Sequence, residues 1–186
     1  MTPKENGLNI FSWLITRIGP LIPKNGKMNN DSPWSSKEHD EQELVTDYIK
    51  DILIKHGATD LRIEPREDLQ YGNLVHLETR FRCSMKGNIA DLATELHPTP
   101  AVGGRPLKEA CEFIMHNEGF SREYFAGYLG VESASGSAYY VNLRCCKWMD
   151  SGVHLFAGGG IVEGSDIAEE WEETEAKIRA IQVTLK

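Results

Sequence analysis

The stretch EYFAGYLGVESASGSAYYVNLRCCKWMDSGVHLFAGGGIV, residues 123–162, decides the fold class of this 186-residue chain. Runs rich in aromatic and β-branched residues at 123–131, 137–148 and 153–162 predict three strands. The segments ESASG and MDSG that separate them have the length and composition of hairpin loops, so neighbouring strands should pair antiparallel. Helical patterns lie on both sides of this stretch. We therefore predict an α+β fold, an antiparallel sheet layered with helices, rather than a repeating βαβ fold.

Two long helices flank this stretch. Ser35 and Glu38 form a capping box, apolar residues follow at helical spacing, and Gly57 offers a C-terminal stop. The final helix begins at Asp166 and carries an apolar stripe that includes Ile167 and Trp171. Between them the pattern predicts strands at 60–65 and 72–85, a short helix at 87–96, a shaped loop at 96–106 and a helix at 106–117.

Composition excludes several classes of partner. A net charge of −8 argues against a nucleic-acid backbone or an anionic membrane as the main partner. The apolar segment 7–23 is interrupted by polar residues, is too short to span a bilayer, and lacks the flanks of a secretory signal. Four cysteines without zinc-site spacing or disulfide density indicate reduced thiols, and we expect a cytoplasmic protein.

Acidic side chains lie beside the apolar faces of both long helices. At about 100° per residue Glu41 falls within the apolar stripe of the first helix, where a carboxylate needs a cation or hydrogen bonds. On the last helix Glu170, Glu173 and Lys177 share one strip, which suits a metal ion and an anion held together. The alternatives are a hydrogen-bonded acid at Glu41, and acids that favour the helix dipole with an i, i+4 ion pair on the last helix.

Two loops and one arginine extend this pattern. The glycine run LFAGGGIVEGSD, residues 155–166, joins a strand to a helix, where free N–H groups suit a carboxylate or phosphate; tight turns or bulges are the alternative. Arg144 lies in the preceding strand candidate, as either a surface residue or a bidentate carboxylate clamp. The loop LHPTPAVGGRP, residues 96–106, holds three prolines and two glycines. That composition favours a loop shaped around a ligand over a purely structural turn.

Several ordered motifs resemble one enzyme family. The motifs are WSSKEHDEQELV, LVHLETRF, HPTPAVGG, FAGYLG, VNLRCCK, LFAGGGIVEGSD and EEWEETEAK. Together they resemble the C-terminal half of the chorismate-utilising enzymes, and isochorismate synthase in particular. The resemblance covers residues 33–186, a predicted chorismate-binding domain, and leaves 1–32 as an unmatched N-terminal segment or linker. It implies the fold of anthranilate synthase component I and the Mg²⁺-dependent isomerisation of chorismate to isochorismate, for menaquinone or siderophore biosynthesis.

The resemblance also implies roles for individual residues. Glu41 and Glu173 would hold the magnesium ion, and Glu170 would join them through water. Arg144 and the backbone at Gly158 would take the enolpyruvyl carboxylate, and Lys177 would add positive charge. The other substrate-binding positions would be His76 near the ring oxygen, Thr99, Ala101 and Val102 in the loop where the family distinguishes its nucleophiles, and Phe125, Leu143 and Phe156 as apolar walls.

This sequence departs from the family in its first part. The lysine general base, the glutamate general acid and an Ala-Gly-Thr loop that precede the metal helix find no match here, so the catalytic residues stay unassigned. General acid–base help is worth about 10²–10⁴-fold per group, and we expect the chain alone to be slow or inactive. A C-terminal fragment, a partner-dependent chain completed by a second chain, and a salicylate, anthranilate or aminodeoxychorismate synthase relative are the alternatives.

Overall fold

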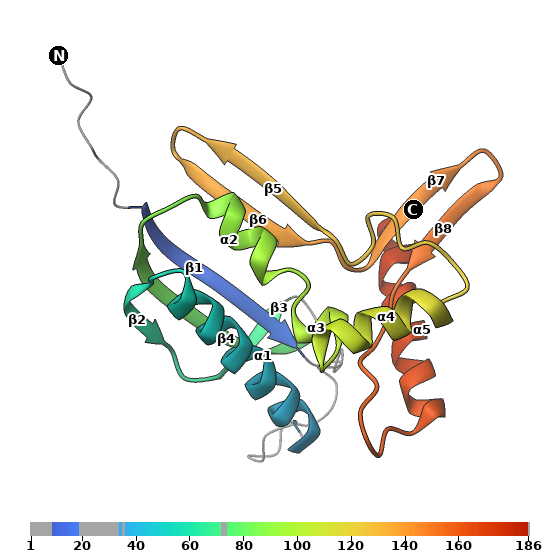
Figure 1. Cartoon of the computed structure of the whole chain (residues 1–186). Coiled ribbons are helices and arrows are strands. Elements are labelled where there is room, and N and C mark those ends of the chain that lie inside the picture. The colour runs from blue at the N-terminus through green and yellow to red at the C-terminus, as the bar shows by residue number, and fades with distance from the viewer. Residues whose placement is uncertain (1–8, 19–33, 35, 72–73, 186) are drawn as a thin grey trace. The chain divides into compact units, whose positions relative to one another are not determined.

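The computed structural model describes residues 9–18, 34, 36–71 and 74–185, and the chain divides into two compact units (Figure 1). Unit 1 is Met1–Thr99 and unit 2 is Pro100–Lys186. Unit 1 contains β1 (Asn9–Ile18), α1 (Ser36–Lys55), β2 (Thr59–Ile63), β3 (Glu67–Tyr71), β4 (Leu74–Met85) and α2 (Ile89–Leu96). Unit 2 contains α3 (Pro100–Gly103), α4 (Leu107–Asn117), β5 (Tyr128–Ser133), β6 (Gly136–Val141), β7 (Cys145–Met149), β8 (Gly152–Phe156) and α5 (Ile167–Thr184).

The sheet of unit 1 is built around β4. Strand β1 pairs antiparallel with one edge of β4, and β2 and β3 pair antiparallel with successive parts of its other edge. The polar strand β3 was not predicted, because its sequence EDLQY lacks apolar alternation. Strand β1 lies within the segment 1–32 that we predicted to be unmatched or a linker. No described helix is long and apolar enough to cross a membrane.

The core of unit 1 forms between α1, β4 and α2. Side chains alternate along β4, so that Phe81 and Cys83 share a buried face. Ile49 and Leu53, one turn apart on α1, pack into the same cluster, and α2 adds Leu92. Over the described residues, α1, α2 and β4 confirm the helices predicted at 35–57 and 87–96 and the strand predicted at 72–85. The capping box proposed for Ser35 and Glu38 lies outside the described side chains.

The strands of unit 2 form two separate hairpins, β5–β6 and β7–β8, which corrects the predicted three-stranded meander. The run 137–148 breaks after Asn142. Asn142 still bonds to Ala126 and Gly127 in line with the β5–β6 pairing, but the amide of Leu143 donates back to the Val141 carbonyl at 3.1 Å and turns the chain. Arg144 follows in the left-handed region, with φ +50°, so it lies between strands and not within one. Ala126, with φ +62°, turns the chain before β5 begins. The α+β class with antiparallel sheets is confirmed.

The proline-rich segment 96–106 is not a loop throughout, because Pro100–Gly103 forms the short helix α3. The amide of Gly104 closes this turn by donating to the Pro100 carbonyl at 2.9 Å. Gly104 has φ +78°, and a Cβ there would lie 2.8 Å from Cβ of Ala110 on α4. Only glycine fits this position, for both its backbone conformation and its space.

Helix α5 begins where the sequence predicts, with Asp166 accepting hydrogen bonds from the amides of Ala168 and Glu169. Its predicted buried stripe is partly wrong. Trp171 is 64% exposed and Ile167 is exposed as well, whereas Glu170 is buried. The hydroxyl of Ser165 donates a hydrogen bond to the Glu170 carboxylate, which offsets part of the free-energy cost of burying it.

Candidate functional site

The acidic strip of α5 contacts the glycine run at the end of β8. Lys177 Nζ lies 2.7 Å from Glu173 Oε1, one helical turn away, and donates to the Gly158 carbonyl at 2.9 Å. The Lys177 side chain is only 15% exposed. The i, i+4 ion pair considered above is therefore present. The same lysine also ties α5 to β8, so its charge is held beside the glycine backbone.

A buried carboxylate lies next to this pair. Glu170 is 7% exposed, and its Oε1 accepts from Ser165 Oγ at 2.6 Å. A Cβ added at Gly159 would lie 3.4 Å from Glu170 Oε2 and 4.0 Å from Lys177 Nζ. Gly159 therefore lies within ordinary contact distance of both charged groups of the helix. The site combines two carboxylates and one ammonium group around a glycine backbone.

An aromatic pair borders the same glycines. The rings of Phe125 and Phe156 stack with centroids 5.5 Å apart, and Phe120 packs against Phe156 at 6.0 Å. A Cβ at Gly158 would lie 3.8 Å from Phe125 Cζ. Two of the three predicted apolar walls, Phe125 and Phe156, thus lie together beside the predicted carboxylate position. The third, Leu143, is exposed.

Arg144 is a candidate ligand for a carboxylate. It makes no hydrogen bond or ion pair with any residue in the described part of the chain. Neighbouring protein atoms desolvate the guanidinium and lower the pKa of Arg144, although the residue as a whole keeps substantial exposure. Its left-handed backbone is uncommon for a residue with a side chain. A guanidinium in this position can bind a carboxylate through two parallel hydrogen bonds.

The remaining predicted site residues lie in unit 1 and in α3. Glu41 is half-buried on α1, and the fully buried polar residue of that helix is Gln42, whose Nε2 donates to Thr79 Oγ1 at 2.8 Å. His76 lies in β4 opposite Leu69, and its side chain is outside the described part. Thr99 ends unit 1, and Ala101 and Val102 lie in α3. Whether Glu41 approaches the acids of α5 stays a prediction, because these residues belong to different units.

The donor set suits a hard divalent cation. Carboxylate oxygens are the ligands that Mg²⁺ prefers, and one or two protein carboxylates with water and substrate oxygens are enough. Glu170 and Glu173 lie three residues apart on one helix face and supply such oxygens. Within the described ranges, no group of three or more acidic, histidine or cysteine side chains could hold a metal. A complete magnesium shell would thus need Glu41, water or substrate in addition.

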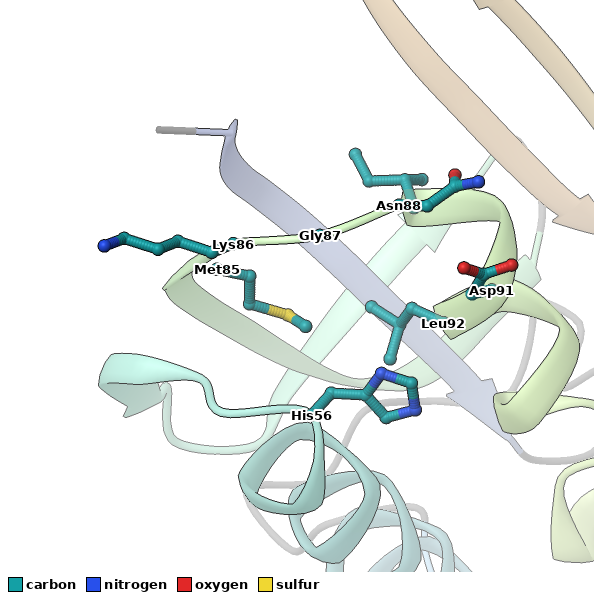
Figure 2. Close-up of a pocket in the computed structure, with 8 residues that line it drawn as sticks. His56, Met85, Lys86, Gly87, Asn88, Asp91 and Leu92 are labelled. Carbon is teal, nitrogen blue, oxygen red and sulfur yellow. The ribbon is translucent and has the colours of Figure 1, made fainter. Parts of the chain in front are cut away.

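A separate pocket of about 170 Å³ lies in unit 1 and contains none of the predicted site residues (Figure 2). It lies between the end of β4 and the start of α2. Its lining residues are His56, Met85, Lys86, Gly87, Asn88, Ile89, Asp91 and Leu92. His56 is engaged by the carboxylate of Glu95, which also pairs with Lys55. These contacts join α1 to α2 and occupy the imidazole of His56.

The supporting residues Gln42, Ser165 and Arg122 were not found by reasoning from the sequence. Ser165 stands directly before the helix cap Asp166, which is a detectable signal. Gln42 lies on the same helix face as Val45, three residues away, so helical periodicity predicts its burial. Periodicity alone does not indicate that a buried glutamine has a hydrogen-bond partner. Arg122 lies in a short connection without periodicity, and nothing in the sequence marks its partners.

Comparison with known proteins assigns these features to one family. The family model described as "Chorismate binding enzyme" matches residues 26–186. The isochorismate synthases EntC and MenF of Escherichia coli K12 are 37% and 35% identical, over 77% and 81% of this chain and 38% and 35% of their own lengths. The solved structure of E. coli MenF, the menaquinone-specific isochorismate synthase, matches with a TM-score of 0.80 and 29% identity, over 97% of this chain and 44% of that one. The chain spans less than half the length of these relatives.

Proposed function

Because this chain belongs to the chorismate-binding enzyme family, we propose that it carries the metal- and carboxylate-binding half of an isochorismate-synthase-type isomerase. The substrate is chorismate and the product isochorismate, with Mg²⁺ as cofactor. One observation carries the proposal: the Glu170, Glu173 and Lys177 strip of α5 is held against Gly158 and Gly159 at the end of β8.

The charges of the site match those of a small dianion. Chorismate carries two carboxylates, which two glutamates alone would repel. Magnesium, when bound by Glu173 and Glu41 with Glu170 through water, supplies positive charge for the ring carboxylate. The other carboxylate would be taken by Arg144 and the backbone at Gly158, with the Lys177 ammonium group nearby. Phe125 and Phe156 would line the apolar side of the ring and limit access of bulk water.

The residues assigned here bind and orient the substrate, and they do not include a proton-transfer pair. Isomerisation adds water at one ring carbon and expels hydroxide from another, so a base must take one proton and an acid must supply one. Ala101 and Val102 lie in α3, and we propose for them the place beside the ring that the family resemblance implies. We therefore expect strong binding and weak or absent turnover from the residues described.

A partner-dependent chain is the second candidate, and the hairpins of unit 2 favour it. In the described ranges, each sheet of unit 2 has only two strands. The apolar side chains of Leu129, Val131 and Tyr140 in β5–β6 are exposed. Two-stranded sheets are marginal alone and are usually completed by further strands. Size-exclusion chromatography with a turnover assay separates the candidates: turnover by the monomeric chain excludes dependence on a partner.

Calorimetric titration of chorismate tests the proposal. We expect binding that requires Mg²⁺ and is lost in Glu173→Ala. The matched control is Glu172→Ala, which removes an acid of the same helix whose side chain is 74% exposed, and which should bind normally. Absence of chorismate binding by the folded chain in excess Mg²⁺, or equal loss in both variants, would contradict the assignment. Chromatography of the products of any turnover distinguishes isochorismate from salicylate or aminated products.

A further inference from the structure

Arg122 lies between two parts of the proposed site that are distant in the sequence. It follows α4, and its Nε donates to Glu118 Oε2 at 2.7 Å while Nη2 pairs with the other oxygen of the same carboxylate. This bidentate ion pair fixes the plane of the guanidinium, whose side chain is only 28% exposed. The pair also raises the pKa of Arg122, so the charge is permanent. The remaining nitrogen, Nη1, is free to reach another segment.

That nitrogen points to the end of α3. Arg122 Nη1 donates to the Val102 carbonyl at 3.5 Å, and Cys111 Sγ donates to the Gly103 carbonyl at 3.7 Å. The last carbonyls of a helix have no partner within the helix, and side chains from elsewhere can satisfy them. A cation is also favoured at this end of a helix. Groups supplied by α4 and by Arg122 therefore contact both of the last carbonyls of α3.

The same guanidinium also contacts the aromatic wall. Arg122 Cζ lies 5.8 Å from the centroid of the Phe125 ring, within the range of a cation–π interaction. The Arg122 carbonyl accepts from the Phe125 amide at 2.7 Å, which fixes the backbone of that turn. Phe125 in turn stacks on Phe156 and lies beside Gly158. One side chain thus contacts both α3 and the wall next to the glycine run.

We propose that Arg122 is a positioning residue that holds Val102 and Phe125 in a fixed relation, and that it thereby sets the shape of the ring side of the site. That these residues border a chorismate site rests on the proposed function. The mechanical link, by which Arg122 contacts both Val102 and Phe125, does not depend on it. Lysine cannot replace it, because an ammonium group lacks the planar fork that serves Glu118 and Val102 together. Glu118 belongs to the same set of contacts, because its bidentate ion pair orients the Arg122 guanidinium.

Hydrogen exchange of single amides in the ligand-free chain tests the link. The variants are Arg122→Met, which keeps an unbranched apolar stem, and Arg122→Lys, with Arg179→Met on the exposed face of α5 as the control. We expect exchange to be about tenfold faster or more at Gly104 and Phe125 in both Arg122 variants, the amount that loss of a charged hydrogen bond predicts. Exchange at the Glu170 amide, which bonds to Asp166, should stay at the wild-type rate.

Ring-proton shifts of Phe125 and Phe156 give an independent spectroscopic readout. They should change in both Arg122 variants and stay constant in Arg179→Met. Uniform acceleration at Gly104, Phe125 and Glu170 would indicate a merely structural role and overturn the proposal. Unchanged exchange, or full rescue by Arg122→Lys, would overturn it as well. If Arg122→Met does not fold, Glu118→Gln, which loosens the same fork, takes its place with the same expected result.

A chorismate titration of the same proteins separates this proposal from the proposed function. Weaker binding in Arg122→Lys, with wild-type binding in Arg179→Met, is expected. Local exchange changes in a chain that never binds chorismate would refute the proposed function and leave the mechanical link intact.

Discussion

Substitution of Gly104 by alanine tests how tightly the segment that carries Val102 is shaped. Gly104 has φ +78°, where a residue with a side chain is about 1–2 kcal/mol less stable per position. The added Cβ would also lie 2.8 Å from Ala110 Cβ, closer than carbon atoms approach without displacement. Overpacking of this kind costs about 1–3 kcal/mol. We expect Gly104→Ala to lower the free energy of unfolding by about 2–5 kcal/mol, the sum of both effects.

Gly164→Ala is the matched control, because it isolates the backbone contribution in the same unit. Gly164 has φ +85°, and nothing lies within 4 Å of its added Cβ. The free energy of unfolding of Gly164→Ala should fall by only about 1–2 kcal/mol, the cost of a side chain in the left-handed region. The double variant Gly104→Ala with Ala110→Gly removes the close contact between the two Cβ atoms. Its second substitution itself destabilises α4 by about 1 kcal/mol, because glycine is a poor helix former.

Urea unfolding followed by circular dichroism and tryptophan fluorescence measures these differences. The expected order of stability is wild type, then Gly164→Ala, then Gly104→Ala. If Gly104→Ala is no less stable than Gly164→Ala, then α4 does not confine this turn and the account of the loop is wrong.

Two further predictions concern other contacts. Hydrogen bonds from Lys55 and His56 lower the pKa of Glu95. The ionised carboxylate therefore stabilises the fold at pH values above its unfolded-state pKa of about 4.3. This stabilisation is lost as the pH falls through the lower pKa of the folded state. Glu95→Gln should therefore be less stable than wild type in urea titrations at pH 7, and the difference should vanish at acidic pH; a constant difference contradicts this. Phe156→Ala removes a stacked ring and should cost about 2–4 kcal/mol, whereas Phe113→Ala, at an exposed ring of α4, should be nearly neutral in thermal unfolding. Equal losses would mean that the aromatic wall contributes no packing.

The helices were predictable because their signals are local. Apolar spacing identified α1, and Asp166 marked the start of α5 as the structure has it. The hairpin loops were also found, since Gly136 and Gly152 lie at positive φ where each turn requires them. Local chemistry therefore gave the elements and their class.

Pairing between distant segments was not predictable in the same way. The chain turns between β6 and β7 because the amide of Leu143 donates back to the Val141 carbonyl, and Arg144 adopts a left-handed conformation without a glycine to signal it. Hydrophobic periodicity also misjudged α5, where Trp171 is exposed and Glu170 is buried. Glu170 is buried with its carboxylate accepting from Ser165, a contact that helical periodicity does not predict. The shared strip of Glu170, Glu173 and Lys177 on α5 was thus predicted, whereas its contacts with Ser165 and Gly158 were not, and its role in a site stays a prediction.

Replacing Mg²⁺ by paramagnetic Mn²⁺ in the isotope-labelled chain, with chorismate bound, shows most directly which helices hold the cation. The account predicts that amide signals around Glu41 on α1 and around Glu173 on α5 broaden together and recover when Mg²⁺ displaces Mn²⁺. Broadening confined to one helix, or spread over the surface without preference for either, would contradict a shared ion between the two acids.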